Sequence, residues 1–235
     1  MTAVLVTRPG GEADPLVRAL EAAGYRVHAV PTVVTRSLDF DQPDLTRYDW
    51  IVVTSAAGVG ALTMPPAGPR WAAVGQATAR ALRAIGVEPA VQPDEADGLA
   101  LANALPDVRG KRVLLVRASA AAPDLPERLR ERGAAVDELT AYLTIEGPES
   151  AAGPLKTALG DVELAAIIFA SGSAVRGYVA LGGTPSRPAI TIGPRTTRVA
   201  EQLGFRVIAQ AARPTAQALA AAVVGAIPVE ERDRA

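Results

Sequence analysis

Residues 4–35, VLVTRPGGEADPLVRALEAAGYRVHAVPTVVT, decide the fold, because they return without a gap at residues 113–144 as VLLVRASAAAPDLPERLRERGAAVDELTAYLT. A shift of 109 positions aligns an apolar run, a helical pattern and a second β-branched run. Self-similarity of this length indicates duplicated structural units. The shift matches these pairs: Leu5 with Leu114, Arg8 with Arg117, Leu16 with Leu125, Leu20 with Leu129, Gly24 with Gly133, Val27 with Val136 and Thr35 with Thr144.

Each copy has the pattern of a strand, a helix and a second strand. In the first copy, residues 4–6 form a short apolar run typical of a buried parallel strand, and the apolar residues of 16–23 recur at helical spacing until Gly24. The second strand is expected at residues 26–30. Further strands are expected at 50–54, 71–74, 89–92, 113–116, 135–139, 166–169, 189–192 and 206–209. Strands that alternate with helices predict parallel sheets of the α/β class.

The segments between the two copies also repeat. A shift of 116 and then, after a short insertion, of 118 relates the segment near 50–105 to the one near 165–225. The chain therefore reads A–B–A′–B′, where A is strand-helix-strand and B is three strand-helix units. The matched pairs are Ile51 with Ile167, Ser55 with Ser171, Val59 with Val175, Gly75 with Gly193, Thr78 with Thr196, Gly86 with Gly204, Gln92 with Gln210 and Leu101 with Leu219.

Two strands cannot bury the faces of a sheet, so each A must join a B. Pairing A with B and A′ with B′ gives tandem domains, whereas pairing A with B′ and B with A′ gives one lobe inserted in the other. We favour the interleaved arrangement, because the second A-type strand runs on through 32–35 and through 141–144, as a bridge would. The predicted lobes are 1–34 plus 146–228 and 40–140, with crossings near 35–39 and 141–145 and a frayed tail at 229–235.

Composition excludes several classes of protein. The chain has no cysteine and one histidine, which excludes disulfides, thiolate metal sites and a cysteine nucleophile. Its 24 basic and 25 acidic residues give a net charge of −1, which argues against a nucleic-acid partner. The apolar run at 4–6 is too short for a signal peptide, and 216–227 is too short for a membrane span. We expect a cytoplasmic protein with no membrane partner.

The candidate ligand-binding segments are the turns that follow the strands. In open parallel sheets, ligands bind at the carboxyl ends of the strands, where helix N-termini present free amide donors. The residues of these turns are small, hydroxylic or glycine. Each turn taken alone is better explained as an ordinary helix cap, and it is their repetition that favours ligand binding. They are Thr7-Arg8-Pro9-Gly10-Gly11, Thr54-Ser55-Ala56-Ala57-Gly58, Gly75-Gln76-Ala77-Thr78, Arg117-Ala118-Ser119, Ser171-Gly172-Ser173 and Gly193-Pro194-Arg195-Thr196.

Familiar cofactor signatures are missing. The turn at Arg8 does not continue as G-x-G-x-x-G, Lys111 has no phosphate loop before it, and no carboxylate cluster suggests a metal. His28 lies on a strand between apolar residues, which favours a packed structural histidine. Tyr142 lies on one of the predicted bridges, where its phenol either faces a cleft or packs half-buried on the strand.

Segments along nearly the whole chain, about 4–227, resemble the uroporphyrinogen-III synthase family. The order and spacing of these segments, rather than any one of them, carry the resemblance. They are Val6-Thr7-Arg8-Pro9, Val53-Thr54-Ser55-Ala56, Ala73-Val74-Gly75-Gln76-Ala77-Thr78, Thr140-Ala141-Tyr142-Leu143-Thr144, Ile192-Gly193-Pro194-Arg195-Thr196-Thr197 and Pro214-Thr215-Ala216-Gln217-Ala218-Leu219. One departure is Ala57, where many relatives carry Arg or Asn.

The resemblance implies two flavodoxin-like parallel-sheet lobes with an interleaved chain and a cleft that closes on hydroxymethylbilane. It implies cyclisation with ring D inversion and loss of water, without cofactor or metal. Nothing in the sequence demands more than a monomer, so a monomer is expected. It places the catalytic tyrosine at Tyr142. The alternative is a two-lobed sensor that binds a small anion without chemistry. Residues expected to hold the carboxylate-rich substrate are Arg8, Ser55, Gly75, Gln76, Thr78, Ser171, Gly172, Ser173, Gly193, Arg195 and Thr196.

Overall fold

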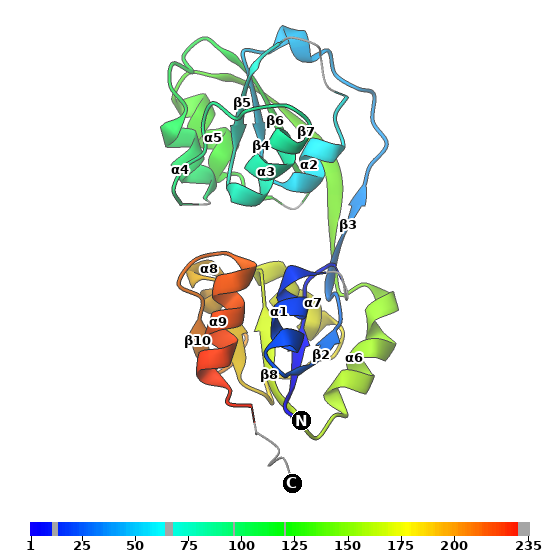
Figure 1. The fold of residues 1–235 in the computed structure, drawn as a ribbon. Coiled ribbons are helices and arrows are strands. Elements are labelled where there is room, and N and C mark those ends of the chain that lie inside the picture. The colour runs from blue at the N-terminus through cyan, green and yellow to red at the C-terminus, as the bar shows by residue number, and fades with distance from the viewer. Residues whose placement is uncertain (11–13, 64–67, 96, 120, 230–235) are drawn as a thin grey trace. The chain divides into compact units, whose positions relative to one another are not determined.

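The computed structural model describes residues 1–10, 14–63, 68–95, 97–119 and 121–229. Gly11 of the first predicted turn and residues 230–235 of the predicted tail lie outside these ranges. The chain divides into two compact units. Unit 1 comprises Met1–Val34 and Ile145–Ala235, and unit 2 comprises Thr35–Thr144. Each unit is built around one sheet with helices on both faces (Figure 1).

Unit 1 holds a five-stranded sheet in the order β10-β9-β8-β1-β2, in which every neighbouring pair is parallel. A strand from the start of the chain, β1, therefore lies between β2 and β8. The strands are β1 Ala3–Val6, β2 Arg26–Ala29, β8 Leu164–Phe169, β9 Ala189–Thr191 and β10 Val207–Gln210. The helices are α1 Pro15–Ala22, α6 Ala152–Leu159, α7 Gly172–Ala180, α8 Pro194–Gln202 and α9 Ala216–Ala226, with a 3₁₀ turn at Glu149–Ala151.

Alternate residues of each strand in unit 1 point to opposite faces of the sheet. Leu5 packs in a core with residues of α6, α7 and α8, whereas Val4 and Val6 pack in a second core with residues of α1 and α9. Helices α1 and α9, near the two ends of the chain, lie side by side on that face (Figure 1). Strands buried on both faces explain the continuous apolar runs seen in the sequence.

Unit 2 holds the second sheet, in the order β3-β7-β6-β4-β5. Strands β5, β4, β6 and β7 are parallel. Helices α2 and α3 cover one face, and α4 and α5 cover the other. The strands are β3 Val33–Ser37, β4 Trp50–Val53, β5 Arg70–Ala73, β6 Arg112–Ala118 and β7 Ala135–Glu146. The helices are α2 Ala56–Gly60, α3 Gln76–Ala84, α4 Gly98–Ala104 and α5 Asp124–Glu131, with a 3₁₀ turn at Leu45–Arg47.

The strand pairing confirms the interleaved α/β fold. The first A segment supplies β1 and β2, which pair with the strands of B′, and A′ supplies β6 and β7, which pair with those of B. The main chain therefore passes between the units twice, after Val34 and after Thr144. No helix among the described residues has both the length and the apolar character that a membrane crossing requires.

Two strand predictions need correction. Residues 89–92 form only a single bridge, between Val91 and Ala72, because Pro89 and Pro93 cannot donate ladder hydrogen bonds. The run through 32–35 does not continue β2: Pro31 interrupts it, and β3 begins at Val33. The matching position in the second copy is Thr140, so β7 runs unbroken for 12 residues.

Candidate functional site

The predicted site residues of unit 1 lie at one edge of its sheet. Because the five strands are parallel, the turns after β1, β8 and β9 all emerge at the carboxyl edge. Helices α7 and α8 begin there, each nine residues long, with their N-terminal amides directed at that edge. The predicted residues gathered at this edge are Arg8, Ser171, Gly172, Ser173, Gly193, Arg195 and Thr196.

Arg8 is held by an ion pair at this edge. Its Nε lies 2.8 Å from Oδ2 of Asp14, and Asp14 is buried and accepts the N–H of Leu16 through Oδ1 at 2.8 Å, which caps α1. The Arg8 side chain is about one-third exposed. Arg8 therefore has a structural partner, and only its exposed side is available to a ligand. Its repeat partner, Arg117, is likewise bound, to Glu138 at 2.7 Å and to the carbonyl of Ala122 at 2.7 Å.

The turn after β8 is fixed by hydroxyl groups and by a close helix contact. Ser171 Oγ accepts the N–H of Ala174 at 3.1 Å, which caps α7, and lies 3.0 Å from Ser173 Oγ. A Cβ on Gly172 would lie 3.0 Å from a methyl group of Val199 on α8. Gly172 is thus explained by helix packing, and Ser171 by capping.

The turn after β9 has no side-chain cap among the described residues. Gly193 is the N-cap of α8 with extended backbone, φ 172°, and Thr196 in the first turn is buried. Sequence reasoning missed the network that supports this turn. Buried Thr191 shares a 2.6 Å hydrogen bond with Thr197, which donates to Gln210 Oε1 at 2.7 Å. The repeat positions of the two threonines are alanines, Ala73 and Ala79, so the network distinguishes unit 1 from unit 2.

Unit 2 presents a matching carboxyl edge. Ser55, after β4, accepts the N–H of Gly58 at 3.3 Å and so caps α2. Gly75, after β5, is the N-cap of α3 with extended backbone, φ −166°, and no side-chain cap. Gln76 is exposed at the first helical position, and Thr78 is 3% exposed, close to the value for Thr196. The equivalence of Thr78 and Thr196 in the repeat therefore extends to their burial and to their place in the helix.

Tyr142 lies on β7 beside the turn that follows β4. Its side chain is 6% exposed and packs in the core shared with α2 and α3. A Cβ added to Gly58 would lie 3.7 Å from Cε1 of Tyr142, so the ring rests against the first turn of α2. The Tyr142 carbonyl accepts the N–H of Ser119 at 3.1 Å. The ring is therefore buried against unit 2, more deeply than a half-buried strand residue.

The hydroxyl of Tyr142 takes no hydrogen bond in the part of the chain that the structure describes. Every fully enclosed polar side-chain atom there has a partner. A hydroxyl without a partner therefore retains contact with solvent. Tyr142 thus combines a ring fixed by packing with a donor that remains available.

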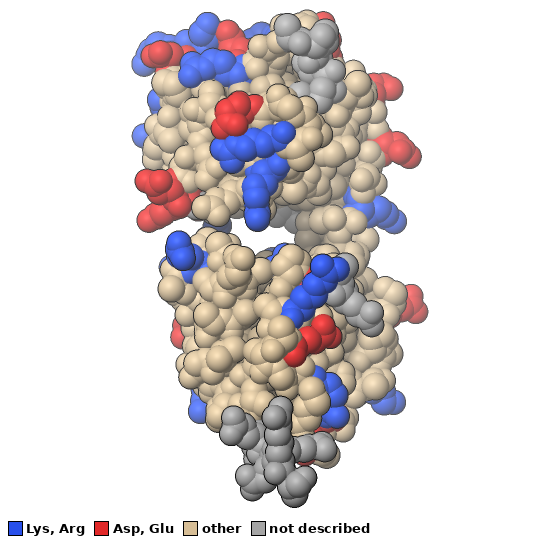
Figure 2. Space-filling view, in the orientation of Figure 1, with Lys and Arg blue, Asp and Glu red and all other residues tan. Residues whose placement is uncertain are grey.

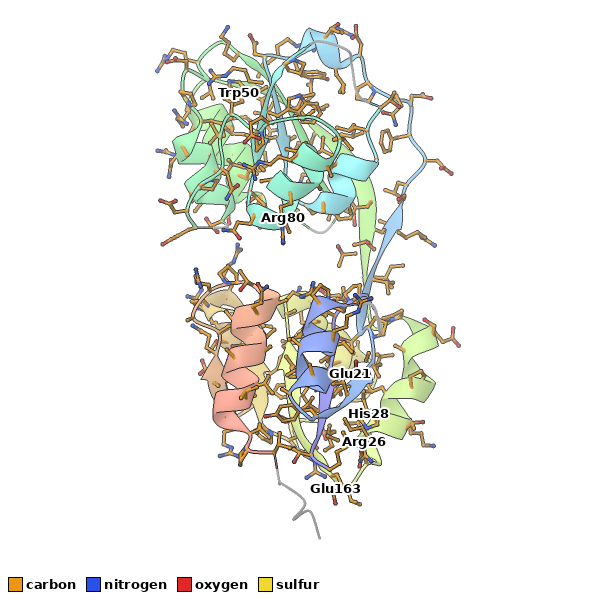
Figure 3. The ribbon with its side chains drawn as sticks, in the orientation of Figure 1. Glu21, Arg26, His28, Trp50, Arg80 and Glu163 are labelled. Carbon is orange, nitrogen blue, oxygen red and sulfur yellow. The ribbon has the colours of Figure 1, made fainter. Side chains whose placement is uncertain are left out.

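A cavity of about 510 Å³ lies away from these edges. Trp50 and Arg70, the first residues of β4 and β5, line it, together with Tyr48, Asp49 and Lys111, so it lies at the amino edge of the unit 2 sheet. The Arg70 guanidinium lies 4.1 Å from the centroid of the Trp50 ring. Figure 3 shows Trp50 and Arg80 toward opposite ends of unit 2. The cavity is therefore distinct from the edge that carries the predicted residues.

His28 has an acidic partner that the sequence did not predict. Its Nε2 lies 2.7 Å from Oδ2 of Asp161, which also accepts from Arg26 at 2.5 Å. The hydrogen bond from His28 has the largest effect on the pKa of Asp161 and lowers it to about 2. Burial opposes this shift, and the Glu163 amide and Arg26 add to it. His28 and Arg26 both come from β2 (Figure 3). His28 is therefore hydrogen-bonded as well as packed.

On the face shown in Figure 2, acidic and basic side chains of each unit are interspersed and do not form one large patch of a single charge. Among the described residues, no three His, Cys, Asp or Glu side chains come together as a metal site would require. What the two edges share is a set of backbone amide donors with small residues around them. Such a set binds anions.

Comparisons with known proteins agree on one family. A family model described as uroporphyrinogen-III synthase HemD matches residues 14–221, more than half of the chain. The chain is 30% identical over 225 residues to the uroporphyrinogen-III synthase of Chlorobaculum parvum, covering 88% of this chain and 92% of that one. It is 28% identical over 228 residues to the porphyrin biosynthesis protein HemD of Ruminiclostridium josui, covering 88% of this chain but 45% of that one.

Two solved structures share the fold. The uroporphyrinogen-III synthetase of Helicobacter pylori superposes with a TM-score of 0.68 at 18% identity, covering 96% of this chain and 99% of that one. A mutant uroporphyrinogen III synthase of Thermus thermophilus gives a TM-score of 0.64 at 20% identity, covering 96% and 97%. At these identities, the likeness bears on the fold alone.

Proposed function

Because the chain belongs to the uroporphyrinogen-III synthase family, we propose that Tyr142 and residues of the two carboxyl edges carry out the cyclisation of hydroxymethylbilane to uroporphyrinogen III. In this reaction the substrate loses its hydroxyl group as water, ring D is inverted through a spiro intermediate, and the macrocycle closes. A pyrrole carbon is the nucleophile, so the protein needs no activated serine or cysteine. Its task is to orient the chain and to prevent direct closure to the type I isomer.

The observation that carries the proposal is the pair of carboxyl edges with uncapped helix N-termini. Gly75 and Gly193 are the N-caps of α3 and α8, and among the described residues neither helix has a side-chain cap. Pro194, the first residue of α8, has no N–H, so the N–H groups that these first turns offer to carboxylates come from the other residues. Each pyrrole of the substrate carries an acetate and a propionate. With a net charge of −1, the protein exerts no strong long-range attraction, and local donors must hold these groups.

Tyr142 is proposed as the catalytic residue. Packing against the α2 turn fixes its ring, and its hydroxyl has no described partner that would compete for the proton. A phenol in this setting donates its proton to the hydroxyl group of the substrate as the C–O bond breaks, so that the hydroxyl leaves as water and the phenol becomes a phenolate. The proton is regained when ring closure restores the aromatic pyrrole.

The remaining predicted residues divide into three roles. Thr78 and Thr196 are buried and are proposed to shape their turns rather than to transfer protons. Ser55, Ser171 and Gly172 hold helix starts in place. The residues proposed to contact carboxylates are Arg8, Gly75, Gln76, Ser173, Gly193 and Arg195. We further propose that the enzyme works as a cytoplasmic monomer and requires no cofactor.

A coupled assay tests the activity directly. Hydroxymethylbilane is generated in situ with and without the protein, and the uroporphyrin isomers are separated after oxidation. Predominance of type III is expected. Type I alone, from protein shown to be folded by circular dichroism, would overturn the proposal and favour a binding protein that closes on an anion without chemistry.

A further inference from the structure

The two helices that begin at the carboxyl edges share one more residue. The segments 75–80 and 193–198 both read Gly-x-x-Thr-x-Arg, so the shift of 118 that pairs the threonines also pairs Arg80 with Arg198. Each arginine is the fifth residue of a nine-residue helix. Two residues beyond a buried threonine, it lies on the opposite, exposed side of the helix.

Both arginines are close enough to the helix start to act at the carboxyl edge. The fifth helical residue lies roughly 6 Å along the axis from the first, and helical side chains lean back toward the N-terminus. Figure 3 shows Arg80 toward the end of unit 2 opposite Trp50, the first residue of β4. The long side chain of Arg80 therefore lies at the edge that carries Gly75 and Thr78.

Neither guanidinium has a partner within the described part of the chain. Arg80 and Arg198 take part in no hydrogen bond, ion pair or ring contact there. By contrast, Arg83 on the same helix α3 is bound to Glu88 at 2.8 Å, and Arg176 on α7 is bound to Glu146 at 2.6 Å. Arg80 and Arg198 thus present all their donors to solvent.

We infer that Arg80 and Arg198 are substrate-binding residues, each of which holds a carboxylate of the linear tetrapyrrole beside the uncapped amides of its helix. A guanidinium binds a carboxylate through two parallel hydrogen bonds, which fixes orientation as well as adding attraction. The inference rests on the proposed function and deepens it. The duplication supplies one such residue in each unit, which suits a substrate with acidic groups on every ring.

Steady-state kinetics of single variants tests the inference. Arg80→Ala and Arg198→Ala are each expected to raise KM for hydroxymethylbilane about five- to tenfold while kcat stays within about twofold, as expected for a lost charge-assisted hydrogen bond. Arg80→Lys and Arg198→Lys are expected to recover part of the loss. Arg109→Ala and Arg206→Ala are matched controls, since both residues are exposed and lie at the amino edges, just before β6 and β10.

Uroporphyrin III binding, followed by its fluorescence, separates this inference from the proposed function. If wild-type protein makes type III isomer but both alanine variants keep the wild-type KM and the wild-type Kd for uroporphyrin III, the inference is wrong. If wild-type protein makes only type I, the proposed function is wrong. The Kd for uroporphyrin III in wild type and in the alanine variants then decides by itself whether Arg80 and Arg198 bind carboxylates. An equal loss in the Arg109 and Arg206 variants would also overturn the inference, because it would reduce the effect to net charge.

Discussion

The backbone of Thr32 touches the backbone of Gly177, so that a Cβ on Gly177 would lie far inside 3.0 Å of the Thr32 carbonyl oxygen. The same carbonyl accepts the N–H of Gly147 at 2.9 Å, and the Thr32 hydroxyl donates to the Ala174 carbonyl at 2.8 Å. Thr32 is fully buried. Thr32 therefore connects both crossing segments to helix α7: its own segment, which leaves unit 1 after Val34, and the segment of Gly147, which follows the crossing after Thr144.

Gly177→Ala is expected to destabilise unit 1 by about 1–3 kcal/mol, because the added methyl must push α7 away from Thr32. Thermal unfolding followed by circular dichroism measures the effect. Gly225→Ala is the control, since a Cβ on that α9 glycine meets nothing within 4 Å. It should be neutral or stabilise by up to about 1 kcal/mol. Equal melting temperatures for the two variants would contradict the close contact.

Tyr142→Phe is expected to lower kcat for type III formation at least several-fold, because it removes the proposed donor to the leaving hydroxyl. The ring and its contact with Gly58 remain, so the melting temperature should not fall. The coupled isomer assay and a thermal scan check the two parts. Undiminished turnover would remove Tyr142 from the mechanism.

Thr78→Ser and Thr196→Ser are expected to retain most activity, whereas the alanine variants lose both stability and part of the activity. The reason is that both side chains are buried in the first turn of their helices and act by shaping the turn. Activity and melting temperature should therefore fall together. An alanine variant that still bound uroporphyrin III but had lost all chemistry would show a direct catalytic role instead.

Acid stability should depend on Asp161. Its folded-state pKa of about 2 lies below the ordinary value of 3.8, so it stabilises the folded protein above about pH 4, and this contribution is lost as pH falls toward 2. Melting temperature measured from pH 5 to pH 2 should fall more steeply for wild type than for Asp161→Asn. Asp94→Asn, at an exposed position without a described partner, should follow the wild-type curve. Parallel curves for wild type and Asp161→Asn would refute the contribution.

The repeat carried most of the fold prediction. Matched leucines and glycines at constant shifts revealed four segments, and the long runs through 32–35 and 141–144 favoured interleaving, which the strand order confirms. Local chemistry then decided the details: Pro31 interrupts the first bridge, and Pro89 and Pro93 reduce an expected strand to one bridge. A repeat reports equivalence of position, but a proline acts at one residue and leaves no trace in the periodicity.

The candidate site was predicted less completely. Strand ends and turns gave the edges, because parallel strands finish on the same side. The pairing of Arg8 with Asp14, the bond from His28 to Asp161 and the contact of Tyr142 with Gly58 were not predictable, since each depends on side-chain directions within the folded unit. The network from Thr191 through Thr197 to Gln210 was hidden because its threonines replace alanines of the other copy.

The placement of β1 between β2 and β8 sets an order of events during synthesis on the ribosome. Every strand of unit 2 has been made by the time residue 146 is added, whereas β1 must wait for β8, which begins at Leu164. The inserted unit can therefore fold first, and the two opening strands lack β8, the second neighbour of β1, until the residues from Leu164 onward have been made. Their apolar residues are then exposed for as long as the whole inserted unit, Thr35–Thr144, is being made.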